Sequence, residues 1–279
     1  MTTADKLNKL FRYIVLGLLA LLCLFSFYIL IVNSTRTHPQ IQKGFSFLPD
    51  KFFMRNLNNV LDNEQVPVLK GIRNSLFVSG ATAGLATYFS AMTAFAIHTY
   101  EFRFKKLAFT FIMMIMMIPQ QVSALGFIKW MAQMNLMDSL LPLYLPAIAS
   151  PVVFYFMISY MQSNLPKAVI EASRMDGASE FRTFNQIVLP IMKPAIAVQA
   201  IFTFVGSWNN YFIPSLIIRS ADKKTMPILV AQLRSADYMK FDMGQVYMLI
   251  FLAIIPIIVV YILLSKYIVR GVAVGSVKE

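Results

Sequence analysis

Long apolar stretches without charged residues alternate with short charged segments along the chain. There are six such stretches, and each can supply the ~20 helical residues that cross ~30 Å of hydrocarbon. The pattern predicts an all-α membrane protein with six transmembrane helices, organised as a single domain over residues 1–279. The predicted spans cover approximately residues 13–35, 74–98, 107–129, 140–162, 194–218 and 245–267, with an outer loop over 36–73 and a cytosolic loop over 163–193.

Composition and charge agree with a bilayer location. Hydrophobic residues make up 58% of the chain and the mean hydropathy is +0.63, which is typical of a protein whose partner is membrane lipid. The net charge of +12 does not predict nucleic-acid binding, because the basic residues are spread over the loops rather than gathered on one helix. The first stretch follows basic residues as in a signal peptide, but its length and the lack of an Ala-x-Ala exit predict a retained span.

Loop charges decide the orientation only weakly. The total number of Lys and Arg residues is similar on both sides, so we compare the shortest loops, for which the positive-inside rule is strongest. Arg103, Lys105 and Lys106 lie on one side and Lys129 alone on the other. This comparison predicts an N-terminus and a C-terminus that are both cytosolic.

The chain lacks the residues that would power transport or catalyse a reaction. No ionisable side chain lies in the middle of a predicted span, which argues against a proton-coupled carrier, although a Na⁺ site made of backbone carbonyls stays open. No phosphate-binding Gly-Lys-Ser/Thr loop and no hydrolase or zinc motif occurs, so we expect a protein that is not an enzyme. The methionines around Met113 suit Cu(I), but they also fill irregular helix contacts, and we expect no metal site.

A polar segment inside the 163–193 loop carries the most informative spacing. Glu171-Ala172-Ser173 is followed after three residues by Gly177, and after nine more by Ile187-Val188-Leu189-Pro190. The apolar positions Leu165, Ala168, Val169 and Ala172 share one helical face, which can pack on a partner or on the chain's own core.

Gly177 is expected to end this first helix. A second helix is predicted to begin with Ser179 as N-cap and Glu180 in its first turn, to carry Phe181, Phe184 and Val188 on one stripe, and to stop near Leu189-Pro190. The alternative is an ordinary amphipathic loop with Glu171 paired to Lys167 or Arg174.

Neutral polar residues recur on one face of the fifth span. Gln199, Thr203, Ser207 and Asn210 follow each other every three to four residues, and such a stripe suits a neutral, hydroxyl-rich solute. The alternative is that these side chains hold neighbouring helices together. Prolines bend the third and fourth spans, which predicts that they line water or pack on protein. The candidate pathway residues are Gln120, Gln121, Gln199, Thr203, Ser207, Asn209, Asn210 and Tyr211.

The Glu171 to Pro190 segment resembles the EAA motif of ABC importer permeases, with Ser173 in place of the second Ala. Further stretches are similar to the shorter six-span permease subunit of the maltose-transporter type, within the binding-protein-dependent ABC sugar importers. They are Phe47-Leu48-Pro49, Arg73-Asn74-Ser75-Leu76, Gly206-Ser207-Trp208-Asn209-Asn210 and the tail from Lys266 to Lys278. The family usually has an acidic residue where this chain has Asn210.

The resemblance implies the transmembrane domain of a type I ABC importer with a cytosolic coupling helix. It further implies a heterodimer with a homologous second permease, two cytosolic ATPase subunits that bind ATP and Mg, and an extracytoplasmic sugar-binding protein, in a bacterial cytoplasmic membrane. The tail after Arg270 would approach the ATPases, and this chain would bind no cofactor. The implied ATPase-coupling residues are Glu171, Ala172, Ser173, Met175, Asp176, Gly177, Ala178 and Ser179.

The sequence leaves two other functions open. The first is an ABC permease for another neutral solute such as a polyol. The second is a gradient-driven carrier or channel that works without an ATPase.

Overall fold

The computed structural model describes residues 3–235 and 241–275, with side chains for 8–235 and 241–265. Within these residues the secondary structure consists of helices joined by turns and loops, without strands. The tail motif from Lys266 to Lys278, including the predicted contact after Arg270, lies outside the described side chains. The elements are α1 (Thr3–Ser34), α2 (His38–Gln42), α3 (Phe53–Leu61), α4 (Val68–Thr99), α5 (Lys105–Met116), α6 (Gln120–Gln133), α7 (Leu141–Tyr144), η1 (Leu145–Ala149), α8 (Pro151–Asn164), α9 (Lys167–Met175), α10 (Glu180–Thr183), the π-helical turn η2 (Phe184–Val188), α11 (Leu189–Ile191), α12 (Lys193–Trp208), α13 (Phe212–Ile217), η3 (Ala221–Lys223), α14 (Met226–Arg234) and α15 (Met243–Gly275).

The chain forms two compact units. The first unit comprises residues 1–68 and 229–255, and the second comprises residues 69–228 and 256–279. Apolar helices long enough to cross a membrane number four within the described residues, or six when each of two bent helix pairs is counted as one span. The fold is therefore that of an all-α membrane protein, and the exact limits of the spans stay predictions.

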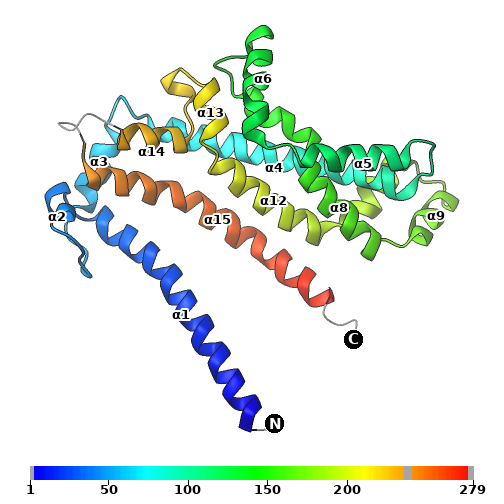
Figure 1. Cartoon of the computed structure of the whole chain (residues 1–279), viewed down its shortest axis with the longest axis horizontal. Coiled ribbons are helices and arrows are strands. Elements are labelled where there is room, and N and C mark those ends of the chain that lie inside the picture. The colour runs from blue at the N-terminus through cyan, green and yellow to red at the C-terminus, as the bar shows by residue number, and fades with distance from the viewer. Residues whose placement is uncertain (1–2, 236–240, 276–279) are drawn as a thin grey trace. The chain divides into compact units, whose positions relative to one another are not determined.

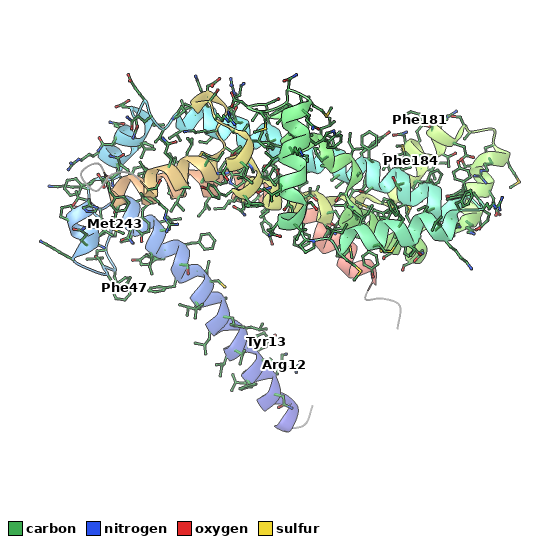
Figure 2. All side chains as sticks on the ribbon, turned by 45° about the horizontal axis from the view of Figure 1, so that its top comes forward. Arg12, Tyr13, Phe47, Phe181, Phe184 and Met243 are labelled. Carbon is green, nitrogen blue, oxygen red and sulfur yellow. The ribbon has the colours of Figure 1, made fainter. Side chains whose placement is uncertain are left out.

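The first unit has a hydrogen-bonded segment after α1 and an exposed first helix. Asn56 of α3 donates to the carbonyl oxygens of Ser34 and Arg36, both at 2.9 Å, and Gly244 packs so closely that a Cβ there would lie 2.8 Å from the Arg36 carbonyl oxygen. The predicted outer loop 36–73 is thus largely helical. Most of α1 is exposed, as the projecting side chain of Tyr13 illustrates (Figure 2), so this apolar helix needs lipid or another protein around it.

The second unit contains the candidate site. A buried apolar cluster joins α4, α8, α9 and η2 through residues such as Phe95, Met157, Ile170, Phe184 and Val188. A second cluster joins α6, α13 and α14. Within this unit α9 lies at one end and α13 toward the other, with α4, α8 and α12 between them (Figure 1).

Proline positions explain where the helices break. The predicted span 107–129 is not one straight helix, because Pro119 lacks an amide donor and begins α6, which turns by 97° from α5. A second bend of 79° separates residues Glu180–Ile191 from α12, with Pro194 in the first turn of α12. The predicted span 194–218 is likewise divided, since α12 ends at Trp208 and α13 begins at Phe212.

Candidate functional site

The elbow, which comprises residues 167–191, has the helix–turn–helix form that the sequence predicts. Helix α9 ends at Met175, and Gly177 has φ +74°, a left-handed conformation that glycine adopts without strain. The amide of Gly177 donates to the Arg174 carbonyl oxygen and that of Ala178 to the Ser173 carbonyl oxygen. Ser179 caps α10 by accepting from the amide of Arg182 at 3.4 Å. The second helical segment continues through η2 and ends at Ile191, next to the predicted end at Leu189-Pro190.

A hydroxyl pair holds the two halves of the elbow together. The Oγ of Ser173 and the Oγ1 of Thr183 lie 2.6 Å apart, and both residues are buried. Ser173, which stands where the family has Ala, thus contributes a hydroxyl group that bonds across the bend between α9 and α10.

The elbow has a buried and an exposed face, and the residues that the sequence groups on one helical face are divided between them. Ile170 is buried against the cluster of the second unit, whereas Ala168 and Ala172 are exposed. Phe181 does not share the buried stripe of Phe184 and Val188, because its side chain is 70% exposed in the first turn of α10 (Figure 2). Met175 is 83% exposed, which leaves an apolar outer face on the elbow.

Arg174 forms an ion pair within the elbow and contacts an aromatic ring directly after α4. The Nε of Arg174 donates to Glu180 at 2.8 Å, and its guanidinium lies 5.5 Å from the ring centre of Tyr100. The pairing of Glu171 with Lys167 or Arg174, which the alternative of an ordinary amphipathic loop implied, is absent from the described residues, where these basic residues pair with Glu101 and Glu180.

The loop that follows α4 adds a further ion pair. Lys167 lies 3.6 Å from Glu101, which also accepts from Lys105 at 2.8 Å. The hydrogen bond from Lys105 lowers the pKa of Glu101 below its usual value. These contacts connect the elbow to the end of α4 and to the loop after it.

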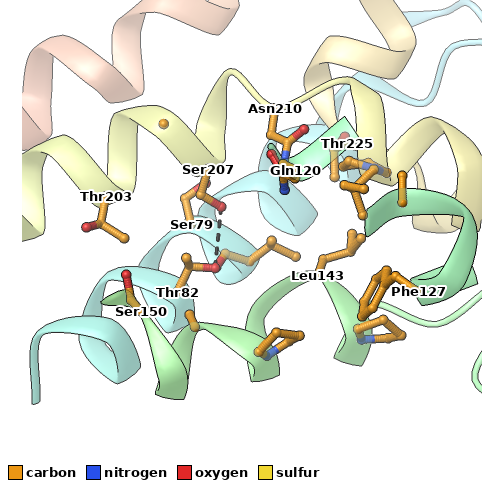
Figure 3. A pocket seen from close by; sticks show the side chains of 18 of the residues that line it. Ser79, Thr82, Gln120, Phe127, Leu143, Ser150, Thr203, Ser207, Asn210 and Thr225 are labelled. Atoms are coloured by element: carbon orange, nitrogen blue, oxygen red, sulfur yellow. Dashed lines mark hydrogen bonds between the residues drawn. The ribbon is translucent and has the colours of Figure 1, made fainter. Parts of the chain in front are cut away.

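A cavity of about 660 Å³ lies in the second unit, between α4, α6, α7, α12 and α13. Of the eight candidate pathway residues, Gln120, Thr203, Ser207 and Asn210 line it, together with Gly206 (Figure 3). Gln121, Gln199, Asn209 and Tyr211 do not line it: Gln199 is buried elsewhere, and the other three are exposed. Four predicted residues, from α6, α12 and the turn after α12, therefore meet at one cavity.

Sequence reasoning missed the hydroxyl groups on the opposite wall. Ser75, Ser79 and Thr82 of α4 line the cavity, as does Thr225 just before α14. The three α4 residues follow a spacing of i, i+4 and i+7, which places them on one helical face. That spacing was readable in the sequence, whereas nothing local marks Thr225. Apolar residues such as Phe127 and Leu143 complete the lining (Figure 3).

Asp138 fixes the connection between α6 and α7 to the segment after α13. Its carboxylate accepts from the amides of Arg219 and Ser220, both at 2.9 Å, and from the Ser220 hydroxyl and Lys223. These hydrogen bonds, led by the one from the Ser220 hydroxyl, hold the pKa of Asp138 far below its usual value. Because α13 contributes Ile213 and Pro214 to the cavity, this carboxylate stabilises one wall.

The residues that the structure describes hold no group of three or more His, Cys, Asp or Glu side chains arranged for a metal ion. The chemistry that the cavity offers is therefore neutral hydrogen bonding against an apolar wall.

The chain is similar to known transport proteins along almost its whole length. It is 32% identical over 266 residues to the arabinooligosaccharides transport system permease protein AraQ of Bacillus subtilis, an alignment that covers 94% of this chain and 92% of that protein. It is 27% identical over 277 residues to the trehalose/maltose transport system permease protein MalG of Thermococcus litoralis, with 98% of each chain covered.

A solved structure shares the fold. One chain in the crystal structure of a bacterial ABC transporter that imports the acidic polysaccharide alginate superposes with a TM-score of 0.82 at 21% identity, over 96% of this chain and 98% of that one. The fold is thus that of a type I ABC importer transmembrane domain. Residues 86–274 match the model of the family described as "Binding-protein-dependent transport system inner membrane component". This chain, a multi-pass transport subunit and not an enzyme, belongs to that family of membrane permeases.

Proposed function

We propose that this chain is the permease subunit of an ATP-driven importer for a carbohydrate, in particular an oligosaccharide. In this proposal it forms half of the translocation pathway beside a homologous second permease, and an extracytoplasmic binding protein delivers the solute. Two cytosolic ATPase subunits drive it through residues 171–190. The observation that carries the proposal is the elbow, whose inner face is fixed to the core while its outer face exposes apolar side chains.

The two faces of the elbow support a coupling role. Met175 and Phe181 are more than two-thirds exposed, and large apolar side chains of this kind contribute most to binding when a partner covers them. The buried Ser173–Thr183 pair and the partly exposed Arg174–Glu180 ion pair join the two helices. A rigid elbow passes the displacement of an ATPase to α4, whereas a flexible one would absorb it.

Nucleotide chemistry is assigned to the partner subunits. The sequence contains no phosphate-binding loop of the Gly-Lys-Ser/Thr kind, so ATP and Mg are proposed to bind to the ATPases and no cofactor to this chain. ATP binding to these subunits would shift the spans from an inward-facing to an outward-facing state. Reversing the preference between these two states from 1:99 to 99:1 requires about 5.5 kcal/mol. The proposed location is the cytoplasmic membrane of a bacterium, with both termini in the cytosol so that the elbow meets the ATPases.

The cavity supports a neutral solute. None of the residues that line it carries a charge, and hydroxyl and amide groups beside Phe127 match the hydroxyl groups and apolar C–H surface of a sugar. The relatives from Bacillus subtilis and Thermococcus litoralis carry names that refer to neutral sugars. The solved relative that imports alginate acts on an acidic polysaccharide, and this cavity offers no cationic side chain for such a solute.

Replacing the exposed apolar residues of the elbow tests the coupling role. We expect Met175→Ser with Phe181→Ser to reduce co-purification of the ATPase at least about thirtyfold, since hot-spot residues contribute about 2 kcal/mol or more. Phe102→Ser is the matched control, because Phe102 is also exposed but lies in the loop between α4 and α5. Wild-type levels of bound ATPase in the double variant, with the permease inserted normally, would contradict the proposal.

A further inference from the structure

Two buried hydroxyl groups at the cavity have no hydrogen-bond partner. Ser79 of α4 is 1% exposed and Thr225 is 4% exposed, and neither side-chain oxygen is paired within the described residues. An unpaired buried hydroxyl is unfavourable because it has lost its bonds to water without replacing them. Thr99 carries a third unpaired hydroxyl but does not line the cavity, whereas Ser79 and Thr225 both do (Figure 3).

The backbone around Thr225 is held in place by hydrogen bonds to the start of α4. The side-chain amide of Asn74 donates to the carbonyl oxygens of Asp222 at 2.8 Å and of Lys224 at 3.1 Å. The amide of Met226 donates to the Oγ of Ser75 at 2.8 Å. The first turns of α4 therefore fix the backbone on both sides of Thr225, so its unpaired hydroxyl belongs to a well-defined position.

Further hydroxyl groups lie beside Ser79. The Oγ of Ser207 donates to the Oγ1 of Thr82 at 3.4 Å (Figure 3), which is longer than the 2.5–3.0 Å of a strong hydroxyl hydrogen bond. A solute hydroxyl can replace this weak contact at little cost. Asn210 and Gln120 add amide groups on the same cavity (Figure 3).

Each of these groups can both donate and accept, which matches the hydroxyl groups of a sugar. The oxygens of Ser79 and Thr225 are covered from water in this state, although their residues line the cavity. Rotation about χ1 between staggered positions moves such an oxygen without moving the backbone. No charged side chain lines the cavity, so a phosphate or carboxylate would be desolvated there without compensation.

We propose that Ser79 of α4, Ser207 of α12 and Thr225 form a subsite in which this chain itself hydrogen-bonds the hydroxyl groups of a neutral carbohydrate. The subsite rests on the proposed function, because it requires that a carbohydrate passes through this cavity. It assigns solute contacts to this permease and not only to its homologous partner.

The test compares Ser79→Ala and Thr225→Val with the wild-type importer, purified with its partners and reconstituted in vesicles with ATP. Arabinotriose and maltose are the neutral probes, and glycerol 3-phosphate is the charged probe. We expect each variant to raise the KM for the transported neutral probe about threefold to tenfold, the value of one or two neutral hydrogen bonds. We also expect the melting temperature without solute to rise or stay unchanged, because each variant removes an unpaired buried hydroxyl.

Thr87→Val is the matched control, since Thr87 lies buried on the same helix but its hydroxyl donates to the Ala83 carbonyl oxygen at 2.7 Å and it does not line the cavity. We expect this control to lower the melting temperature and to leave KM unchanged. A KM within twofold of wild type in both cavity variants, or equal loss of stability in all three, would overturn the subsite. If the wild-type importer transports glycerol 3-phosphate but neither sugar, the proposed function fails and the subsite fails with it.

Discussion

The elbow and the cavity, which lie at opposite ends of α4, differ in how their hydroxyl groups are bonded. At the elbow, the buried hydroxyls of Ser173 and Thr183 bond to each other across the bend, although the Thr99 hydroxyl at that end of α4 is unpaired and does not line the cavity. Near the cavity, the hydroxyls of Ser79 and Thr225 are unpaired, and each such group costs about 1–3 kcal/mol. The paired hydroxyls of the elbow suit the proposed role in coupling, whereas the unpaired hydroxyls of the cavity suit the proposed binding of a solute. Variants at the two ends should therefore fail in different ways.

The largest effect is expected at the bend of the elbow. Gly177→Val places a β-branched residue at φ +74°, and because a Cβ there would meet no atom within 4 Å, the penalty comes from the backbone conformation alone. That penalty is about 1–2 kcal/mol, or roughly fivefold to thirtyfold in the population of the correct bend. We expect ATP-driven uptake to fall by that factor while membrane insertion stays normal.

Gly177→Asn is the control for this variant, because Asn adopts the left-handed conformation more readily than other residues with a side chain. Normal uptake by Gly177→Val, or equal loss in both variants, would show that the backbone conformation at this position does not determine coupling.

An effect of similar size is expected at the hydroxyl pair of the elbow. Thr183→Val leaves the Ser173 hydroxyl buried without a partner, which should destabilise the bend by about 1–3 kcal/mol. Hydrogen exchange of residues 167–191 should increase, and uptake should fall without a change in KM. Adding Ser173→Ala removes the unpaired group and should restore most of the loss. If the double variant exchanges faster than Thr183→Val, the two hydroxyls do not act as a pair.

A smaller effect is expected at the cavity end. Asn210→Ala should raise the KM for the transported sugar about threefold to tenfold, because it removes one amide from the lining, and should leave ATPase co-purification unchanged. Weaker ATPase binding with an unchanged KM would instead indicate that Asn210 holds helices together.

The smallest effect concerns pH. Asp138 has a folded-state pKa below its unfolded value, so its contribution is present above the unfolded pKa of about 3.9 and is lost as pH falls through that value toward the folded one. We therefore expect no change in the Asp138 contribution to the melting temperature between pH 8 and pH 5. The comparison is with Asp138→Asn over the same range: a difference between the two proteins that shrinks from pH 8 to pH 5 would contradict the assignment.

Local spacing made the elbow readable from the sequence. Gly177 and Ser179 mark a helix end and a helix start within a few residues, and both predictions agree with the structure. Phe181 was misplaced because the 3.6-residue period groups it with Phe184, although the first turn of α10 lies next to the bend, where its side chain stays exposed. The role of Ser173 depends on its partner ten residues away, which spacing alone does not reveal.

Half of the candidate pathway residues line the cavity. The sequence could not identify the other lining residues, because long-range contacts determine which residues face the cavity. The hydroxyls on α4 follow a readable period, but the helix carries further hydroxyls such as Thr87 and Ser90, so the sequence does not say which face meets a cavity. Thr225 is placed by Asn74, about 150 residues earlier in the chain. Gln199 shares the period of Thr203 and Ser207 but is buried one turn beyond the cavity.

The central claim is that this chain transports only when an ATPase moves its elbow. The most direct measurement is uptake of arabinotriose and maltose into vesicles that contain either this chain with its second permease alone or the complete importer with ATP and binding protein. We predict accumulation of one of these sugars only by the complete importer, unaffected by an ionophore. Accumulation without the ATPase, abolished by the ionophore, would contradict the claim.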